Sequence, residues 1–302
     1  MTPALTGCLT YTHRVPRTRL PDVVYGASLD QLLKQADDRF DAVHSMTLFI
    51  EMSTSTGGSM KGEVKESINF KGYIIIGKPE QIRVLLLLPV VRSTALDMVS
   101  DGKSFKMLIP PKNCAIVGSD VVTNSSQKGL YSLRPGVILD SMLIHGKEDD
   151  QLVAMTQGSR IIPDPKHSKD LIDEPDYDLE FLSQPQGKVA QILRVLHVSR
   201  VNLLPHRQDI YNSEGKVATQ AFYSNYQKFG DVTFPTKIVI QRPLDELGLT
   251  ITVIKGTNFN QKLDADAFDL GPIPENYATY NMDDPAVAST VPCAAHAPQS
   301  PH

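Results

Sequence analysis

The chain has 302 residues, 41% of them hydrophobic and 21% charged, which is ordinary globular composition and excludes collagen, a coiled coil and general disorder. The formal net charge is −4, and the 30 basic residues are scattered, so the sequence predicts neither a nucleic-acid partner nor a polybasic membrane patch. No segment reaches the roughly 18 to 20 apolar residues that a membrane-spanning helix needs.

Residues 1–27 are predicted to be a truncated signal with a lipid-anchoring cysteine and a tether. Leu5-Thr6-Gly7-Cys8 has the form of a bacterial lipobox, in which an apolar residue and two small residues precede the lipidated cysteine. Only Met1–Ala4 precede it, where an apolar stretch is expected, so the signal is trimmed or the start codon is placed too late. The alternative is a chance match. Residues 9–25 have no regular pattern, as expected of a tether.

The other two cysteines are expected to be unpaired. Cys114 has apolar neighbours and is interpreted as a buried strand thiol, whereas Cys293 lies in a Pro/Ala/Ser-rich segment and is expected to have no role. The wide spacing of the three cysteines favours neither a zinc site nor a disulfide scaffold.

A helix is predicted to begin the folded domain. Ser28 and Gln31 have the spacing of a capping box. From Leu29 to Val43, apolar residues recur at helical intervals, and charged residues occupy the opposite face. The pattern predicts an amphipathic helix packed on an apolar surface.

Strand-like segments follow the helix, at 46–52, 64–76, 81–88, 94–100 and 104–109. Because short turns join them, they predict an antiparallel meander. Residues 74–76 and 85–88 are apolar on both faces, so both faces must be covered. One face could then pack a helix while the other lines a cavity. The alternative is a strand buried between core and lid, with no cavity.

The middle and end of the chain complete the fold prediction. Pro135-Gly136 followed by apolar residues 137–144 predicts a short, buried or lid-like helix. Residues 164–178, with Pro163, Pro165 and Pro175 among charges, are expected to be a long exposed loop. Further strands are predicted at 179–183, 191–203, 206–211, 216–226, 235–241 and 249–254. About ten antiparallel strands with two helices indicate one curved sheet or open barrel, over 28–276, before a disordered tail at 277–302.

The polar residues do not describe an active site. None of the common nucleotide-binding, serine-hydrolase or zinc-protease motifs occurs. Ser-x-x-Lys occurs three times, two of them in expected hairpin turns, and the eight histidines are dispersed. We therefore expect a protein that is not an enzyme and that carries no metal or cofactor.

Three passages resemble the family of periplasmic lipoprotein-localisation proteins, LolA and LolB, over roughly Ser28 to Leu270. Residues 99–105 resemble the central hairpin of the carrier LolA. Residues 83–90 and 93–96 resemble a strand, loop and strand of LolB. Residues 223–243, 249–254 and 263–268 resemble the C-terminal hairpin of the carrier.

The resemblance implies an unclosed antiparallel β-barrel in which helices form a lid over a hydrophobic cavity for acyl chains. It also implies a lid latch at Lys78, where LolA has an arginine, although lysine lacks the planar fork of donors that arginine offers. This lysine and the expected anchor at Cys8 favour a LolB-type receptor over a soluble carrier. The lid would be formed by Ile138, Leu139, Met142 and Leu143.

Alternation along the strands selects the residues expected to face the cavity, and a one-residue register error would exchange the two faces. The candidates are Met46, Leu48, Ile50, Val84, Leu86, Leu88, Phe105 and Met107.

The loop between two of these strands is expected to touch the membrane. Val90 matches the apolar residue that LolB projects into the membrane, and Val91 and Arg92 adjoin it. The alternative is that the two valines fold back on the core.

The function expected from these features is that of a lipoprotein anchored at Cys8 in the bacterial cell envelope, facing the periplasm, at the outer rather than the inner membrane. It would bind acyl chains of lipoproteins or phospholipid, with a soluble LolA-type carrier as a candidate partner. Two alternatives stay open. One is a periplasmic sensor or interaction module that uses the same half-barrel. The other is a lipid hydrolase, which needs a serine–histidine convergence that the sequence does not show.

Overall fold

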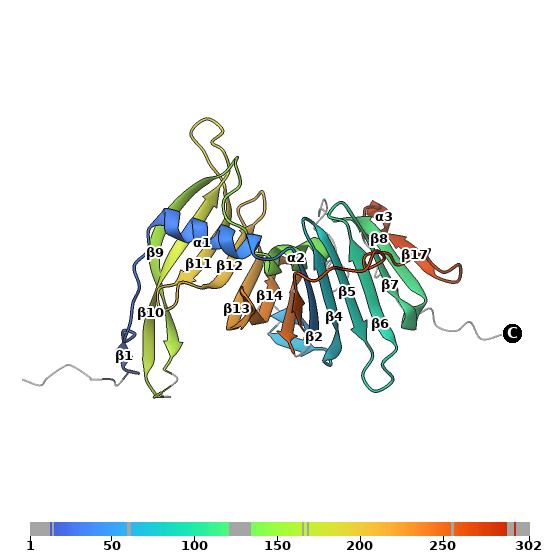
Figure 1. The fold of residues 1–302 in the computed structure, drawn as a ribbon, viewed down its shortest axis with the longest axis horizontal. Coiled ribbons are helices and arrows are strands. Elements are labelled where there is room, and N and C mark those ends of the chain that lie inside the picture. The colour runs from blue at the N-terminus through green and yellow to red at the C-terminus, as the bar shows by residue number, and fades with distance from the viewer. Residues whose placement is uncertain are drawn as a thin grey trace, which may run out of the picture.

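The computed structural model describes residues 13, 15–58, 62–120, 134–164, 166–167, 169–254, 257–288 and 293. These residues form one large sheet with short helices against it (Figure 1). The helices are α1 (Leu29–Asp41), α2 (Pro135–Met142) and α3 (Pro285–Ala288), and the 3-10 turns are η1 (Pro110–Lys112) and η3 (Pro243–Asp245). The strands are β1 (Thr18–Arg19), β2 (Ser45–Gly58), β3 (Glu63–Glu66), β4 (Phe70–Gly77), β5 (Gln81–Leu87), β6 (Thr94–Ser100), β7 (Ser104–Ile109), β8 (Cys114–Ser119), β9 (Leu152–Pro163), β10 (Leu171–Leu182), β11 (Ile192–Ser199), β12 (Pro205–Tyr211), β13 (Val217–Phe229), β14 (Val232–Arg242), β15 (Leu247–Val253), β16 (Asn258–Phe259) and β17 (Ala278–Asn281).

The sheet is long and does not close on itself. Strands β9 to β15 pair in sequence, β15 then pairs with β2, and β2 leads through β4 to β8 and β17. The pairs are antiparallel except β1 with β10 and β17 with β8, which are parallel. No pairing among the described strands joins β9 to β17. The prediction of a mainly β protein with an unclosed sheet and helices against it is confirmed.

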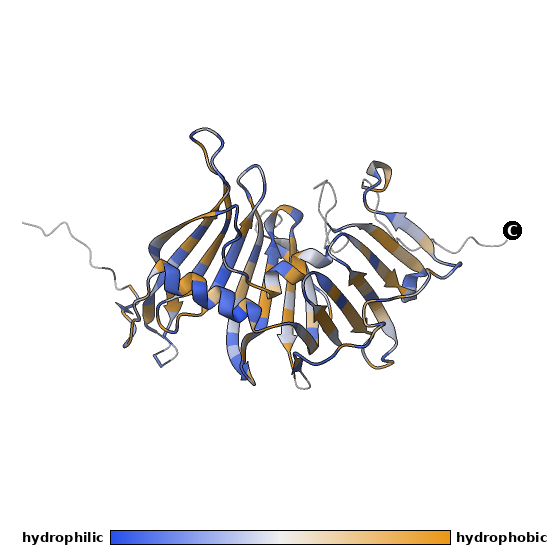
Figure 2. Ribbon diagram, turned by 45° about the horizontal axis from the view of Figure 1, so that its top comes forward, coloured by the Kyte–Doolittle hydropathy of each residue, from blue (hydrophilic) through white to orange (hydrophobic). Residues whose placement is uncertain are grey.

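Helix α1 covers one half of the sheet. Its capping box is formed, because the Ser28 amide donates to Oε1 of Gln31 at 2.9 Å and the Gln31 amide donates to Oγ of Ser28. Its buried Leu32 packs on a small core from β10 and β11 that includes Leu179 and Phe181. The opposite side of α1 is largely hydrophilic (Figure 2). The amphipathic helix predicted from the sequence is present.

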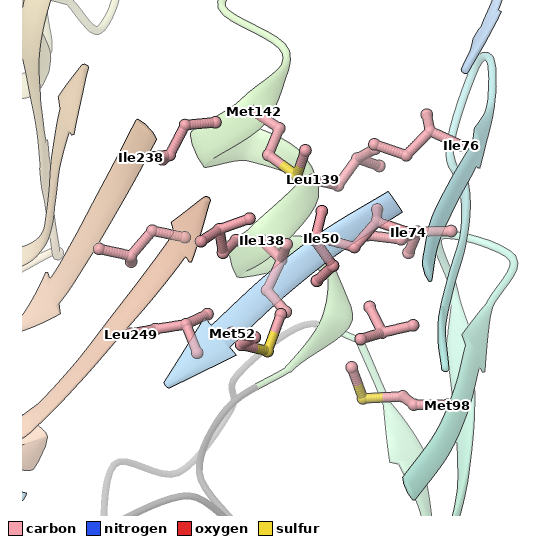
Figure 3. Packing of buried hydrophobic residues seen from close by; sticks show 14 of the residues in the cluster. Ile50, Met52, Ile74, Ile76, Met98, Ile138, Leu139, Met142, Ile238 and Leu249 are labelled. Atoms are coloured by element: carbon pink, nitrogen blue, oxygen red, sulfur yellow. The ribbon is translucent and has the colours of Figure 1, made fainter. Parts of the chain in front are cut away.

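The larger core lies along the other half of the sheet and under α2. Hydrophobic and hydrophilic residues alternate along most strands (Figure 2), so one face of the sheet is apolar. In Figure 3, Ile138 and Met142 of α2 lie between Ile238 of β14 on one side and Ile74 of β4 on the other. Helix α2 therefore closes the core between two parts of a curved sheet.

The exposed loop predicted at 164–178 is wrong in its second half. Strand β10 begins at Leu171 and pairs with β9 along its whole length. Pro175 is tolerated because pairing with β11 begins only at Asp176, so its missing amide breaks no ladder bond there. Three of the carboxylates that suggested a loop are instead paired with side chains on other strands: Glu174 with Arg160, Asp176 with His206 and Asp178 with His197.

Both segments expected to lie outside the folded domain contribute to it. In the predicted tether, β1 pairs with β10, and Arg19 Nε donates to Oδ2 of Asp164 at 2.8 Å. In the predicted tail, β17 pairs with β8. Residues 1–12, 289–292 and 294–302 are outside the described residues.

The expectation that two cysteines are unpaired is also wrong. Cys114 of β8 and Cys293 form a disulfide, and both side chains are buried in the larger core. The bond holds the segment around Cys293 against β8, beside the last strand of the sheet, β17.

Candidate functional site

An apolar cavity of about 270 Å³ lies at one end of the larger core. Its wall is formed at the end of the strands where β5 turns into β6 and where β7 leads into η1. Exposed Pro111 and half-buried Leu88 belong to this wall, so the cavity reaches the surface there. The lining residues are Met52, Thr54, Phe70, Val84, Leu86, Leu88, Ala95, Leu96, Met98, Met107, Ile109, Pro111, Lys112 and Ile138.

The residues predicted to line a cavity divide into two groups. Val84, Leu86, Leu88 and Met107 line this cavity. Met46, Leu48, Ile50 and Phe105 are buried in the same core but further along the strands. The alternation thus identified the apolar face of the sheet, because all the predicted cavity residues except Leu88 belong to the larger core.

Sequence reasoning missed the lining residues that complete the cavity. Phe70 begins β4, Ala95 is near the start of β6 and Ile109 ends β7. Their shared position is a property of the sheet: antiparallel strands place the end of one beside the start of the next. Marking the residues at this end of each apolar strand would have found them.

Helix α2 carries three of the four predicted lid residues and Leu143 directly follows it, and all four are buried. Ile138 lines the cavity, and the other three belong to the surrounding core. Polar contacts hold the helix at both ends. The Gly136 amide donates to Oδ1 of Asp120 at 3.0 Å, and Gln208 Nε2 donates to the carbonyl of Asp140 at 3.2 Å.

The predicted latch, Lys78, contacts α1 rather than α2. Its ammonium group donates to the carbonyl of Phe40 and lies 3.4 Å from the centre of the Phe40 ring. Burial lowers the pKa of Lys78. Lys78 therefore fixes the C-terminal end of α1.

An arginine that the sequence did not single out holds the segment after α2. Arg194 of β11 is 6% exposed, donates to the carbonyl of Gly146, and lies with its guanidinium carbon 3.6 Å from the centre of the Phe181 ring. Burial lowers its pKa to about 10. Its partners lie far apart in the sequence, so only the folded chain reveals this contact.

The loop between β5 and β6 projects two valines into solvent. Val90 is 97% exposed and Val91 is 70% exposed, so the alternative that they fold back on the core is wrong. The loop is a defined turn, in which the Arg92 amide donates to the carbonyl of Leu88 at 3.0 Å. Val90 has a φ of 72°, which is unusual for a β-branched residue. Because Leu88 lines the cavity, the loop lies beside its surface end.

The anchor predicted at Cys8 lies outside the described residues. Within the described part of the chain, no helix is long and apolar enough to cross a membrane.

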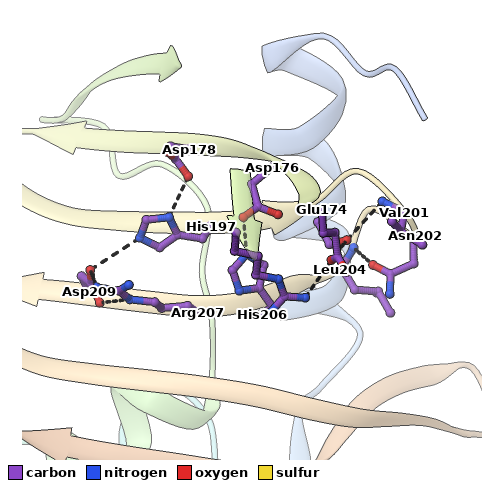
Figure 4. A network of polar contacts seen from close by, with 12 residues as sticks. Glu174, Asp176, Asp178, His197, Val201, Asn202, Leu204, His206, Arg207 and Asp209 are labelled. Atoms are coloured by element: carbon purple, nitrogen blue, oxygen red, sulfur yellow. Dashed lines mark hydrogen bonds and ion pairs between the residues drawn. The ribbon is translucent and has the colours of Figure 1, made fainter. Parts of the chain in front are cut away.

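A polar network lies on the face of β10, β11 and β12 (Figure 4). His197 lies between two carboxylates, with Nδ1 at 2.7 Å from Oδ1 of Asp178 and Nε2 at 3.5 Å from Oδ2 of Asp209. Burial opposes protonation of His197, but the two carboxylates outweigh it and raise its pKa to about 9. Nearby, His206 Nε2 lies 3.0 Å from Oδ2 of Asp176. Among the described residues, no cluster of three or more histidine, cysteine or acidic side chains could hold a metal ion.

Three comparisons show what known proteins this chain is similar to. A family model described as "-like: Uncharacterized protein" matches residues 169–272. A search of curated proteins gives no match. The structure of a DUF1329 family protein from Desulfovibrio piger is 17% identical with a TM-score of 0.50, covering 79% of this chain and 95% of that chain. The structure of a LolA superfamily protein from Nitrosomonas europaea is 14% identical with a TM-score of 0.48, covering 80% of this chain and 98% of that chain. The similarity between this chain and the DUF1329 family structure is a similarity of fold.

Proposed function

We propose that the protein is a non-catalytic binder of acyl chains, which takes the chain of a lipoprotein or phospholipid into the apolar cavity. The observation that carries the proposal is the position of the cavity, which reaches the surface beside the exposed valine loop. An apolar chain leaving a membrane at Val90 and Val91 would have only a short path to the cavity wall at Leu88.

The size of the cavity suits part of an acyl chain. Its volume of about 270 Å³ exceeds that of the ~150 Å³ apolar cavity known to take up benzene. Each buried methylene contributes about 0.8 kcal/mol, so affinity should rise with chain length until the cavity is full. Binding by burial alone needs no catalyst and lets the cargo leave again.

We place the protein in the bacterial cell envelope, anchored through Cys8 and facing the periplasm. The disulfide between Cys114 and Cys293 fits this location, because disulfides form and persist in oxidising compartments such as the periplasm. The resemblance of residues 83–96 to LolB favours the outer membrane, with a soluble LolA-type carrier as the donor of cargo.

Native mass spectrometry of the full chain with fatty acids of increasing length tests the proposal. We expect one acyl chain per protein, with affinity rising about fourfold per methylene and then reaching a plateau. Ala95→Phe should abolish binding because Ala95 lines the cavity. Ala154→Phe is the matched control, since Ala154 is equally half-buried but lies on β9. Absence of any acyl complex would instead favour the interaction-module alternative, and equal effects of the two substitutions would exclude this cavity as the site.

A further inference from the structure

A second hollow, of about 580 Å³, lies on the opposite side of the valine loop from the apolar cavity. We call it the outer hollow. It is formed on the outward face of β2, β4 and β5 and under the loop itself, and Leu88 lines both it and the cavity. Its lining residues are Phe49, Asn69, Lys71, Tyr73, Leu87, Leu88, Pro89, Val90 and Arg92.

The charges lining the outer hollow are both positive. Lys71 and Arg92 line it, and its described lining includes no carboxylate. Glu51, on the neighbouring strand, lies outside the lining, with Oε1 3.5 Å from Nζ of Lys71. Lys71 is 63% exposed, and such surface ion pairs contribute little. An anion entering the hollow could therefore compete for this ammonium group.

The wall of the outer hollow is aromatic. The rings of Phe49 and Tyr73 lie with their centres 5.1 Å apart, and Tyr73 is 38% exposed although it lies within a strand. Tyrosine is enriched where membrane meets water, because its ring is apolar and its hydroxyl is polar. An exposed tyrosine beside two cations and two exposed valines is a combination suited to a lipid surface.

We propose that the outer hollow binds the phosphate of an anionic phospholipid headgroup when Val90 and Val91 enter the membrane. Lys71 and Arg92 contact the phosphate, Asn69 offers a further polar contact, and the aromatic wall faces the glycerol. The inference deepens the proposed function and rests on it for the membrane contact of the loop. The headgroup is then held on one side of the loop, and the acyl chain enters the cavity on the other.

Sedimentation with phospholipid vesicles tests the site. The test variant is Lys71→Gln with Arg92→Gln, and the control is Lys103→Gln with Lys228→Gln, which removes the same charge at the opposite end of the strands. Vesicles contain phosphatidylcholine, with or without phosphatidylglycerol. We expect the test variant to bind the anionic vesicles about 30-fold more weakly than the parent protein. The control should bind as the parent does.

The outcomes separate this inference from the proposed function. Equal losses in both double variants would indicate general electrostatic attraction and overturn the site, as would no loss in either. Titration with inorganic phosphate shows whether the hollow binds free phosphate or a lipid headgroup. If free phosphate binds through Lys71 and Arg92 but the test variant binds vesicles as the parent does, the headgroup assignment is overturned. Acyl binding by native mass spectrometry should be the same in all variants. If neither the parent nor any variant binds an acyl chain, but vesicle binding still depends on Lys71 and Arg92, the acyl function is overturned and the headgroup site is retained.

Discussion

The backbone of Val90 lies in the left-handed region, which is unfavourable for a β-branched residue. A β-branched residue at a φ of 72° costs on the order of 1–3 kcal/mol, and glycine or asparagine would adopt the same backbone more readily. Its side chain is 97% exposed, so no packing in the described chain offsets that cost. An apolar, strained and exposed residue at a loop tip is consistent with contact to an apolar partner outside the chain.

Substitution of Val90 by glutamate should separate stability from transfer. The free energy of unfolding should change by less than about 0.5 kcal/mol, since the side chain is exposed, whereas transfer of acyl cargo into liposomes should fall. Urea denaturation and a liposome-transfer assay measure the two effects. Val189→Glu is a control, because Val189 is 66% exposed in the distant β10–β11 connection. Substantial unfolding of Val90→Glu, or unchanged transfer, would show that the loop has an ordinary structural role.

At the scale of single residues, the sequence predicted which face of a strand a side chain occupies better than it predicted where along the sheet that side chain lies. Alternation placed Val84, Leu86 and Met107 on the buried face because side-chain direction in a strand is a local property. It did not distinguish Met46, deep in the core, from Leu86 at the cavity. That difference depends on where the strands end relative to one another, which the pairing of the whole sheet decides.

At the scale of elements, β10, β11 and β12 form a polar cross-link on one face of the sheet. Asp178 of β10, His197 of β11 and Asp209 of β12 lie in a row, and Arg207 Nε donates to Oδ1 of Asp209 at 2.7 Å. A charged imidazole can donate through both nitrogens, so His197 links three strands when it is protonated.

The stability contributed by His197 should therefore depend on pH. Folding raises its pKa from an ordinary 6.5 to about 9, so its contribution is complete below pH 6.5 and is lost as the pH rises through about 9. The free energy of unfolding of the parent protein should exceed that of His197→Gln by about 3 kcal/mol near pH 6.5. Urea denaturation between pH 6.5 and 10 should show this difference shrinking.

A second variant tests whether Asp178 is a charged partner of His197. Asp178→Asn removes one carboxylate, so the loss of stability should begin at a lower pH than in the parent protein. A difference between parent and His197→Gln that stays constant up to pH 10 would mean that His197 is not a charged link.

The same elements show what local patterns can and cannot predict. Helix α1 was predicted from its capping box and the strands of the meander from alternation, because both signals lie within the element. Strand β10 was missed because Glu174, Asp176 and Pro175 suggested an exposed loop. Glu174 accepts from Arg160 Nη2 at 2.7 Å and from Ser199 Oγ at 2.6 Å, and these partners lie on other strands. Charges neutralised by distant residues cannot be distinguished from solvated ones within one segment.

At the scale of the whole molecule, the disulfide joins two cysteines separated by 179 residues. It restrains the segment after β17 against β8, which pairs with β17 in parallel at this end of the sheet. The sequence could not show this pairing, because three cysteines allow several partners and the composition of the last segment suggested disorder.

Loss of this bond should reduce global stability. Cross-linking distant residues restricts the unfolded chain, so removing the bond should lower the free energy of unfolding by about 2–4 kcal/mol. Urea denaturation of Cys114→Ala with Cys293→Ala, compared with the parent protein, measures the loss. Dithiothreitol should lower the stability of the parent protein to a similar degree and leave the double variant unchanged. Equal stability of the parent with and without reductant would contradict a structural role for the bond.

The place of β2 in the sheet has a consequence for how the protein is made. Strand β2 opens the meander and pairs with β4, yet along its other edge it pairs with β15, near the end of the domain. Strands β4 to β8 can fold back one after another, but the edge of β2 that pairs with β15 stays open until β15 joins the sheet. Such non-local pairing makes folding slow, and an open apolar strand edge invites pairing with other chains. The chain is therefore prone to aggregate during folding until the segment that contains β15 has joined β2.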